Sequence, residues 1–313
     1  MKTKTILVLL MALPLLACGS KEKHTLEFNL NKGEVYSYTM QSDVSTTQSM
    51  MGQEMTTGIK MNAKTHYDVT DVQGDVYSLN MFYDAMRMEM NTDMGAMGGT
   101  QNIVIDSETA AETVTPDNPG AIFKAMTKVP FSITITKKGE VKSAEGFESM
   151  TEEMIAAMGE DMDAQSMAEA QANLTEQFNS DAVKAAIEQM ASYFPENPVS
   201  IGESWNKTTS IKSGQFTFNL DMKYTLQSIE DNIAVLKMDG TLNVPEESAK
   251  LDMQGMEATL TLSGTQTGTM NVDMNTGWTT QMDAVQDLTG NIGVMGMAIP
   301  MTMTSKTTMS AVK

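Results

Sequence analysis

The sequence predicts a mainly β protein of the α+β class, in which two antiparallel β-meander modules flank a helical insertion and form a sandwich or a curved half-barrel. Three observations predict this fold. Long segments alternate apolar and polar residues, a central segment has helical periodicity instead, and the pattern that begins the first module returns after residue 198. A chain of 313 residues with 41% hydrophobic residues can bury a sizeable core.

The beginning of the chain is typical of a signal peptide. Lys2 and Lys4 lead into an apolar run over residues 6–16, which is too short to span a bilayer. The run ends in Leu15-Leu16-Ala17-Cys18, and Cys18 is the only cysteine. A cysteine directly after a small residue at a cleavage position resembles the lipobox of bacterial lipoproteins, whose cysteine is acylated. The alternative is an ordinary secreted protein with a spare thiol, which is unusual in an oxidising compartment.

We therefore expect residues 1–17 to be a lipoprotein signal peptide and Cys18 to be the site of lipidation. Residues 18–29 read as a polar tether, followed by a single β-rich domain over residues 30–313. Two or more acyl chains would hold such a protein firmly on a membrane.

The first half of the domain, residues 30–115, carries the pattern of an antiparallel meander. Apolar and polar residues alternate strictly over residues 59–69, which indicates a strand with one buried face. Residues 72–76 supply a turn around Gly74, and the alternation resumes over residues 77–83.

The segment 116–198 is predicted to be an insertion that contains a hairpin and helices. Lys137-Lys138-Gly139 separates two short alternating runs, as a hairpin turn does. Ser149 with Glu152 fits a capping box, and Ser180 or Asp181 can cap a second helix that points Val183, Ile187 and Met190 inward. The first helix carries methionines at four-residue spacing on one face: Met150, Met154, Met158 and Met162.

The second half, residues 199–313, looks like a copy of the first. Lys32-Gly33-Glu34-Val35-Tyr36 resembles Ile201-Gly202-Glu203-Ser204-Trp205. Six apolar positions of the first meander also match six of the second without a gap: Tyr67, Val69, Val72, Val76, Leu79 and Met81 with Tyr224, Leu226, Ile229, Ile233, Leu236 and Met238. Asn275-Thr276-Gly277 predicts a further hairpin.

The composition argues against several classes of function. A formal net charge of −19 repels phosphate backbones, so we expect no nucleic acid partner. The histidines are His24 and His66, too few for a His/Cys zinc site, and His66 lies on the polar face of a strand with no nucleophile motif nearby. No glycine-rich nucleotide motif opens a helix. We expect no cofactor and no enzymatic activity.

The chain resembles a family of uncharacterised lipoproteins common in Bacteroidota-type bacteria. The resemblance rests on the lipobox, the early Gly-Glu strand, and two later sets of residues: Pro195, Pro198, Val199 and Gly202 to Trp205, and the hairpins from Gly264 and Gly268 to Gly277. It implies a cell envelope location and a β-rich domain of unknown function, and it supplies no catalytic residue. The meanders also suggest an analogy with the curved half-barrels in which periplasmic lipoprotein carriers hold lipid tails.

Methionine is unusually frequent, with 32 residues. Thioethers are soft ligands, so Met86, Met88 and Met90 are candidate ligands for Cu(I) or silver. A simpler interpretation places methionine on buried faces in place of leucine and isoleucine. A third interpretation, intermediate between these two, is a concave surface lined by methionine that adapts to a flexible apolar ligand.

The leading hypothesis is a lipoprotein anchored in the envelope, most simply in the outer membrane, that binds an apolar small molecule or an envelope protein without catalysis. Two alternatives stay open. One is a methionine-rich Cu(I) or silver-binding protein. The other is an envelope enzyme that uses carboxylates alone, for which two acids must converge in one pocket.

Overall fold

The computed structural model describes residues 22–50, 52–95, 98–111, 120–127, 129–158, 164–177, 180–213, 216–245, 250–253, 256–294 and 297–312. The expected signal peptide and Cys18 lie outside these residues. The first half contains β1 (Val35–Met50), β2 (Gln53–Gln73), β3 (Val76–Asp93) and β4 (Thr100–Asp106). The insertion contains α1 (Ala121–Met126), β5 (Phe131–Thr136), β6 (Val141–Glu145), α2 (Phe147–Ala157), α3 (Ala164–Gln177) and α4 (Ser180–Ala191). The second half contains β7 (Ser204–Ser213), β8 (Phe216–Glu230), β9 (Ile233–Asn243), β10 (Lys250–Met253), β11 (Met256–Asp273), β12 (Thr279–Val294) and β13 (Met297–Val312).

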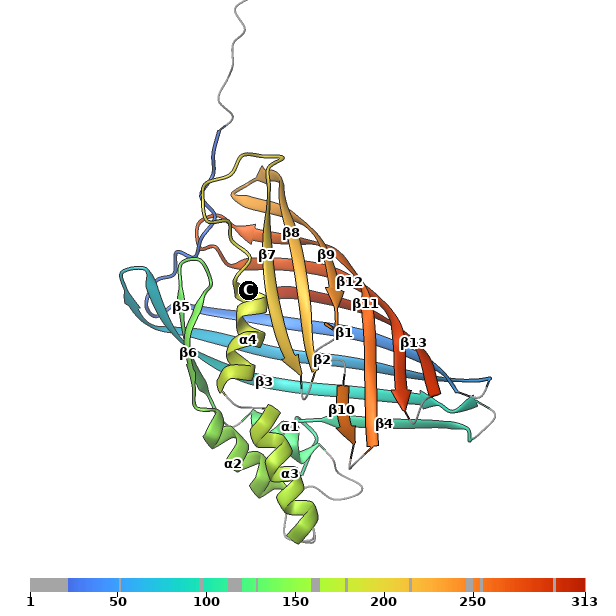
Figure 1. The fold of residues 1–313 in the computed structure, drawn as a ribbon. Helices are drawn as coiled ribbons and strands as arrows, with labels where there is room; N and C mark the ends of the chain where they lie inside the picture. The colour runs from blue at the N-terminus through green and yellow to red at the C-terminus, as the bar shows by residue number, and fades with distance from the viewer. Residues whose placement is uncertain are drawn as a thin grey trace, which may run out of the picture.

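All the described strands form one antiparallel sheet in the order β6-β5-β3-β2-β1-β13-β12-β11-β9-β8-β7, with β4 beside β3 and β10 beside β11 (Figure 1). The predicted fold class, mainly β with a helical insertion, is confirmed. The two meanders join because β1 pairs with β13, from Ser37 opposite Val312 to Gln48 opposite Met301. The sheet stays open along this path, and its two edges are β6 and β7.

The two halves begin with the same glycine turn. Gly33 has a φ of 88° and Gly202 a φ of 90°, a conformation that favours glycine. The Gly33 N–H donates to the carbonyl oxygen of Val69 at 2.8 Å, and the Gly202 N–H donates to that of Leu226 at 2.7 Å. Val69 and Leu226 are matched positions of the sequence repeat, so the repeat is present in the local structure as well as in the sequence.

The glutamate after each glycine repeats its role too. The carboxylate of Glu34 accepts the N–H of Asn31 at 3.0 Å, and that of Glu203 accepts the N–H of Ser200 at 2.8 Å. Each carboxylate therefore satisfies a backbone donor that the turn leaves free, which holds the chain at the entrance to each module.

Glycines inside β11 and β12 allow neighbouring strands to approach closely. A Cβ atom on Gly264 would lie 1.9 Å from the Asp287 carbonyl oxygen, and one on Gly290 would lie 1.8 Å from that of Thr261. Both obstacles are backbone atoms, which cannot move aside as a side chain can. Glycine at such positions marks a bend or a close approach in a sheet, and these two residues permit the curvature of this wall (Figure 1).

The helices α1, α2 and α3 gather at one end of the sheet (Figure 1). The inward methionine face predicted for the first helix is confirmed at Met150, Met154 and Met158, which are buried, whereas Met162 lies outside the described residues. The capping box predicted from Ser149 and Glu152 is wrong. The helix begins at Phe147 after Gly146, whose φ of 97° ends the preceding strand without a side-chain cap.

The chain before β1 differs from the tether expected through residue 29. His24 forms an isolated β-bridge with Val199. Leu26 and Phe28 are only 2% and 4% exposed, and the Phe28 N–H donates to the carbonyl oxygen of Lys137 in the β5–β6 turn at 2.8 Å. Residues 24–30 are therefore part of the packed domain, because their alternate apolar side chains have a buried face.

We predict that Gly264→Ala lowers the free energy of unfolding by about 2 kcal/mol or more, because the added Cβ meets backbone on β12. Gly58→Ala is the control, since the nearest atom to its added Cβ is 3.9 Å away, at ordinary contact distance. Urea unfolding of the purified variants measures both values. Equal stability of the two variants would contradict the close approach.

Candidate functional site

Helix α4 covers both edges of the open sheet. It contacts β6 at one end of the strand order and β7 at the other. The Val141 N–H on β6 donates to the Glu188 Oε1 atom of the helix at 3.1 Å. On the opposite side, the Trp205 Nε1–H of β7 donates at 2.7 Å to the carbonyl oxygen of Tyr193, just after the helix. The helix therefore covers the seam between the two edge strands. Without this cover, the exposed backbone groups of both edges would be free to pair with other chains.

The apolar stripe of α4 faces inward but is incompletely packed. Its members follow the spacing of one helical face: Val183, Ala186, Ile187, Met190 and Ala191. An amphipathic helix ordinarily buries such a stripe against the core. Here Met190 remains 51% exposed and Ala186 is exposed as well. All five residues line a cavity between the helix and the sheet.

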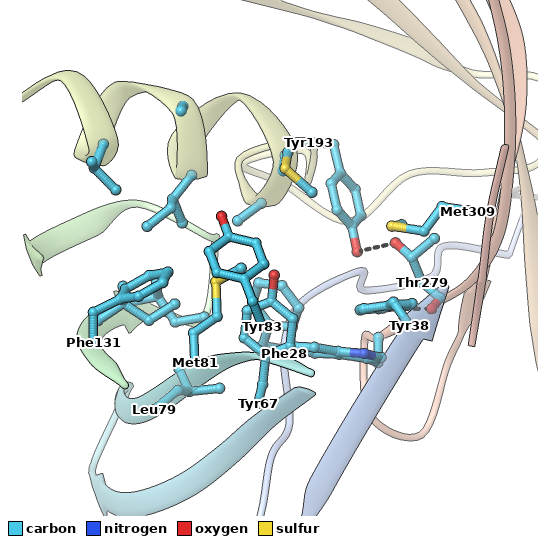
Figure 2. Close-up of a pocket in the computed structure, with 18 of the residues that line it drawn as sticks. Phe28, Tyr38, Tyr67, Leu79, Met81, Tyr83, Phe131, Tyr193, Thr279 and Met309 are labelled. Atoms are coloured by element: carbon cyan, nitrogen blue, oxygen red, sulfur yellow. Dashed lines mark hydrogen bonds between the residues drawn. The ribbon is translucent and has the colours of Figure 1, made fainter. Parts of the chain in front are cut away.

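This first cavity has a volume of about 280 Å³, and we call it the aromatic chamber. Figure 2 shows its aromatic side chains between the helix and the strands. The described lining contains no Asp, Glu, Lys, Arg or His side chain. Eight aromatic residues line it, namely Phe28, Tyr38, Tyr67, Tyr83, Phe131, Phe147, Tyr193 and Trp278, together with Leu79, Met81, Ile133, Ile135, Met150, Thr279, Met309 and the α4 stripe.

Two tyrosine hydroxyls of the chamber are used in structural hydrogen bonds. Tyr38 donates to the Thr279 carbonyl oxygen at 2.8 Å, and the Tyr193 hydroxyl lies 3.1 Å from Thr279 Oγ1. Tyr67 and Tyr83 instead rise from the strands with their hydroxyls toward α4 (Figure 2). Burial raises the pKa of both Tyr67 and Tyr83, so both phenols stay protonated at neutral pH.

A second cavity of about 280 Å³ adjoins the first, and we call it the methionine chamber. The two linings share Met190 of α4 and Met309 of β13, both flexible side chains, so the chambers are neighbours. The lining contains seven methionines, namely Met40, Met190, Met222, Met238, Met270, Met282 and Met309, together with Ser192, Lys207, Thr209, Leu220, Tyr224, Gln266, Ala284, Gln286, Ser305 and Thr307.

Strand register brings four of these methionines into one row. Met270 of β11 lies opposite Met282 of β12, which lies opposite Met309 of β13, which in turn lies opposite Met40 of β1. Side chains directly opposite each other share a face of the sheet. The single cation of this lining, Lys207, is paired with Glu196 at 2.9 Å.

Met86, Met88 and Met90 occupy one face of β3 at alternate positions. They lie opposite Ala63, Met61 and Ile59 of β2, and Met86 is only 4% exposed. None of the three lines either chamber. Their role as Cu(I) or silver ligands stays a prediction. Within the described part of the chain, no group of three or more His, Cys, Asp or Glu side chains is arranged to hold a metal ion.

His66 lies on the outer part of the sheet, as its polar strand position predicted. Its Nδ1 atom is 2.7 Å from Asp84 Oδ1, and its ring stacks on Phe82 at a centroid distance of 4.5 Å. Neither chamber, as far as its lining is described, contains a carboxylate. The carboxylate enzyme left open by the sequence therefore finds no pair of acids at these cavities.

Sequence reasoning identified the inward face of α4 and missed most of the chamber walls. The signal for Leu26 and Phe28 was present, because they alternate with Thr25 and Glu27. The row of methionines was not visible, since it depends on the register between strands that are far apart in the sequence.

The fold and its cavities define a class: a mainly β protein with one open sheet, a helix across its seam and an apolar cavity beneath that helix. The chain belongs to the family of unknown function DUF6263, whose model matches residues 74–279. The matched part runs from the turn after β2 through α4 to Thr279, and so includes much of both chamber linings. A comparison with curated proteins found no match.

Among solved structures, the chain is similar to an outer membrane channel of Pseudomonas putida F1 at 6% identity and a TM-score of 0.25, covering 91% of this chain and 97% of that chain. It is also similar to OccK7 of Pseudomonas aeruginosa at 5% identity and a TM-score of 0.24, covering 90% and 99%. Scores this low establish neither a shared fold nor a shared function. Across the described residues, no helix has both the length and the apolar character needed to cross a membrane.

We predict that Glu188→Ala speeds amide hydrogen exchange at Val141 by about tenfold, because the edge N–H loses its acceptor. Glu188→Gln keeps an amide oxygen at the same place and should retain most of the protection. Hydrogen–deuterium exchange followed by mass spectrometry resolves the segment around β6. Unchanged exchange in Glu188→Ala would show that the helix does not hold this edge.

Proposed function

We propose that this protein is a non-catalytic binding protein of the bacterial cell envelope that holds an uncharged apolar molecule between α4 and the concave face of the sheet. The observation that carries the proposal is the apolar stripe of α4, which lines a cavity along its length even though Val183, Ile187 and Ala191 also contact the core. A concave, mostly apolar cavity with a few polar groups is the usual form of a small-molecule site.

The methionine walls support a flexible ligand. Methionine side chains are unbranched and adapt to irregular shapes, so a surface rich in them accommodates more than one conformation of a bound chain. The charge of the linings supports an uncharged ligand. Lys207 is the one charged side chain in either described lining, and it is already paired with Glu196.

An acylated Cys18 would keep the site close to a membrane, where apolar molecules are dissolved. The first described residue that is bonded to the domain is His24, through its β-bridge with Val199, so the chain from Cys18 to this point can reach no more than ~20 Å when fully extended. The proposal therefore places the domain on the membrane surface, most simply that of the outer membrane, and within reach of lipid.

The direct test is to purify the full chain gently and identify any bound molecule by mass spectrometry after organic extraction. We expect an uncharged apolar compound in stoichiometric amount. A protein that is empty after purification and that takes up no apolar probe afterwards would refute the proposal.

We predict that Ala186→Phe reduces ligand binding about tenfold, or roughly 1.4 kcal/mol, by filling the aromatic chamber from the helix side. Ala185→Phe is the matched control, because Ala185 is on the same helix and lines neither chamber. Binding of a fluorescent fatty alcohol measures the effect, and melting temperatures verify that both variants are folded. Equal loss in both variants would remove the chamber as the site.

We predict that Cys18→Ser releases the protein from membranes without changing its melting temperature, because Cys18 is the expected anchor and the described packing of the domain begins at His24. Fractionation after a high-salt wash measures the release. A Cys18→Ser protein that still sediments with membranes would show that attachment does not depend on acylation of this residue.

A further inference from the structure

We propose that the bound molecule has two parts, a flat uncharged ring with an oxygen acceptor and a flexible hydrocarbon tail, which is the chemistry of an isoprenoid quinone. The ring occupies the aromatic chamber and the tail occupies the methionine chamber. This inference rests on the proposed function and names the class of its ligand.

The walls of the two chambers differ in stiffness. Aromatic rings support one another around the first chamber: Trp278 stacks on Tyr36 at a centroid distance of 4.4 Å and on Tyr38 at 5.6 Å. Such planar walls favour a planar guest, which gains offset stacking with them. The second chamber is lined by seven flexible methionines, which impose no fixed shape, and by polar side chains such as Gln266, Gln286 and Thr307.

The absence of charge in the described lining of the aromatic chamber selects a neutral head. A carboxylate or a phosphate that entered it would lose its hydration without meeting a cation. The head of the ligand is therefore uncharged, which distinguishes it from a fatty acid and from a phospholipid headgroup.

Tyr83 supplies the hydrogen-bond donor that this head requires. Tyr38 and Tyr193 already bond to Thr279, and the neighbouring Thr65 side chain interacts with Tyr67 and partly offsets the rise in its pKa. The Tyr83 hydroxyl forms no hydrogen bond with any described residue, although it lies in the lining and points toward α4 (Figure 2). Tyr83 is only partly buried, so its hydroxyl is open to the chamber, and a ring carbonyl oxygen there would accept its proton.

Continuity between the chambers explains why one molecule uses both. Met190 and Met309 belong to both linings, and Met190 is 51% exposed, so its side chain has room to move. A tail that leaves the ring between these two side chains runs directly along the row of Met309, Met282 and Met270.

The test is calorimetric titration of the full-length protein in detergent with three probes: decylubiquinone, the same benzoquinone ring without its tail, and decanol. We expect decylubiquinone to bind at least tenfold more tightly than either fragment and to quench the fluorescence of Trp278. If decanol binds as tightly as decylubiquinone, the ring is not recognised and this inference is wrong, while the proposed function stands. If none of the three binds and no molecule co-purifies, the proposed function itself fails.

Two conservative variants locate the ring. Tyr83→Phe should weaken decylubiquinone binding about five- to tenfold and leave decanol binding unchanged, because only the hydroxyl is lost. Tyr224→Phe is the control, because its hydroxyl also lacks a partner among the described residues but lines the methionine chamber. If Tyr224→Phe lowers the affinity for the quinone and Tyr83→Phe does not, the ring lies in the other chamber and the assignment is overturned.

Discussion

The structure depends on how the two edges of its sheet are covered. An open sheet leaves backbone N–H and C=O groups unpaired along its first and last strands. Here α4 lies against both β6 and β7, accepts the Val141 N–H on one side and is tied to Trp205 on the other. Gly139 allows the end of the helix to lie directly on the β5–β6 turn, since a Cβ there would be 1.9 Å from the Ala191 carbonyl oxygen. The insertion between the two modules is thus what closes the molecule.

Helix α4 spans the seam between β6 and β7 and leaves space between itself and the sheet. A strand that paired with both edges would leave no such space. Its apolar stripe is held over the concave face by contacts at the edges, so the middle of the stripe faces a cavity. The side chains that line this cavity then determine which kind of ligand fits it. Aromatic side chains, including Tyr83 with its unpartnered hydroxyl, line the cavity beneath the stripe from Val183 to Ala191, and the methionine chamber meets the helix at Met190.

The internal repeat shows where the two halves have diverged. Their glycine turns, glutamate caps and register agree, and Met81 of the first module corresponds to Met238 of the second. Two residues further on, Tyr83 corresponds to Gly240, where a Cβ would lie 2.1 Å from the Met222 sulfur. One copy therefore contributes a phenol to the aromatic chamber, and the other removes a side chain so that methionine can fill the second chamber.

The sequence by itself determined the strands, the hairpins at Gly139 and Gly277, the repeat and the inward faces of α2 and α4, because alternation, turn glycines and helical spacing are local properties. The alternation of Leu26, Phe28 and Leu30 with polar residues also indicated a buried face, but the position of this segment just after the expected lipidation site favoured the interpretation as a tether. Only the tertiary structure placed Met40 beside Met309 and α4 across both sheet edges. The register between strands from opposite ends of the chain sets these contacts. A local alternation of apolar and polar residues does not specify that register, because every pairing shifted by two residues keeps the apolar side chains on the same face.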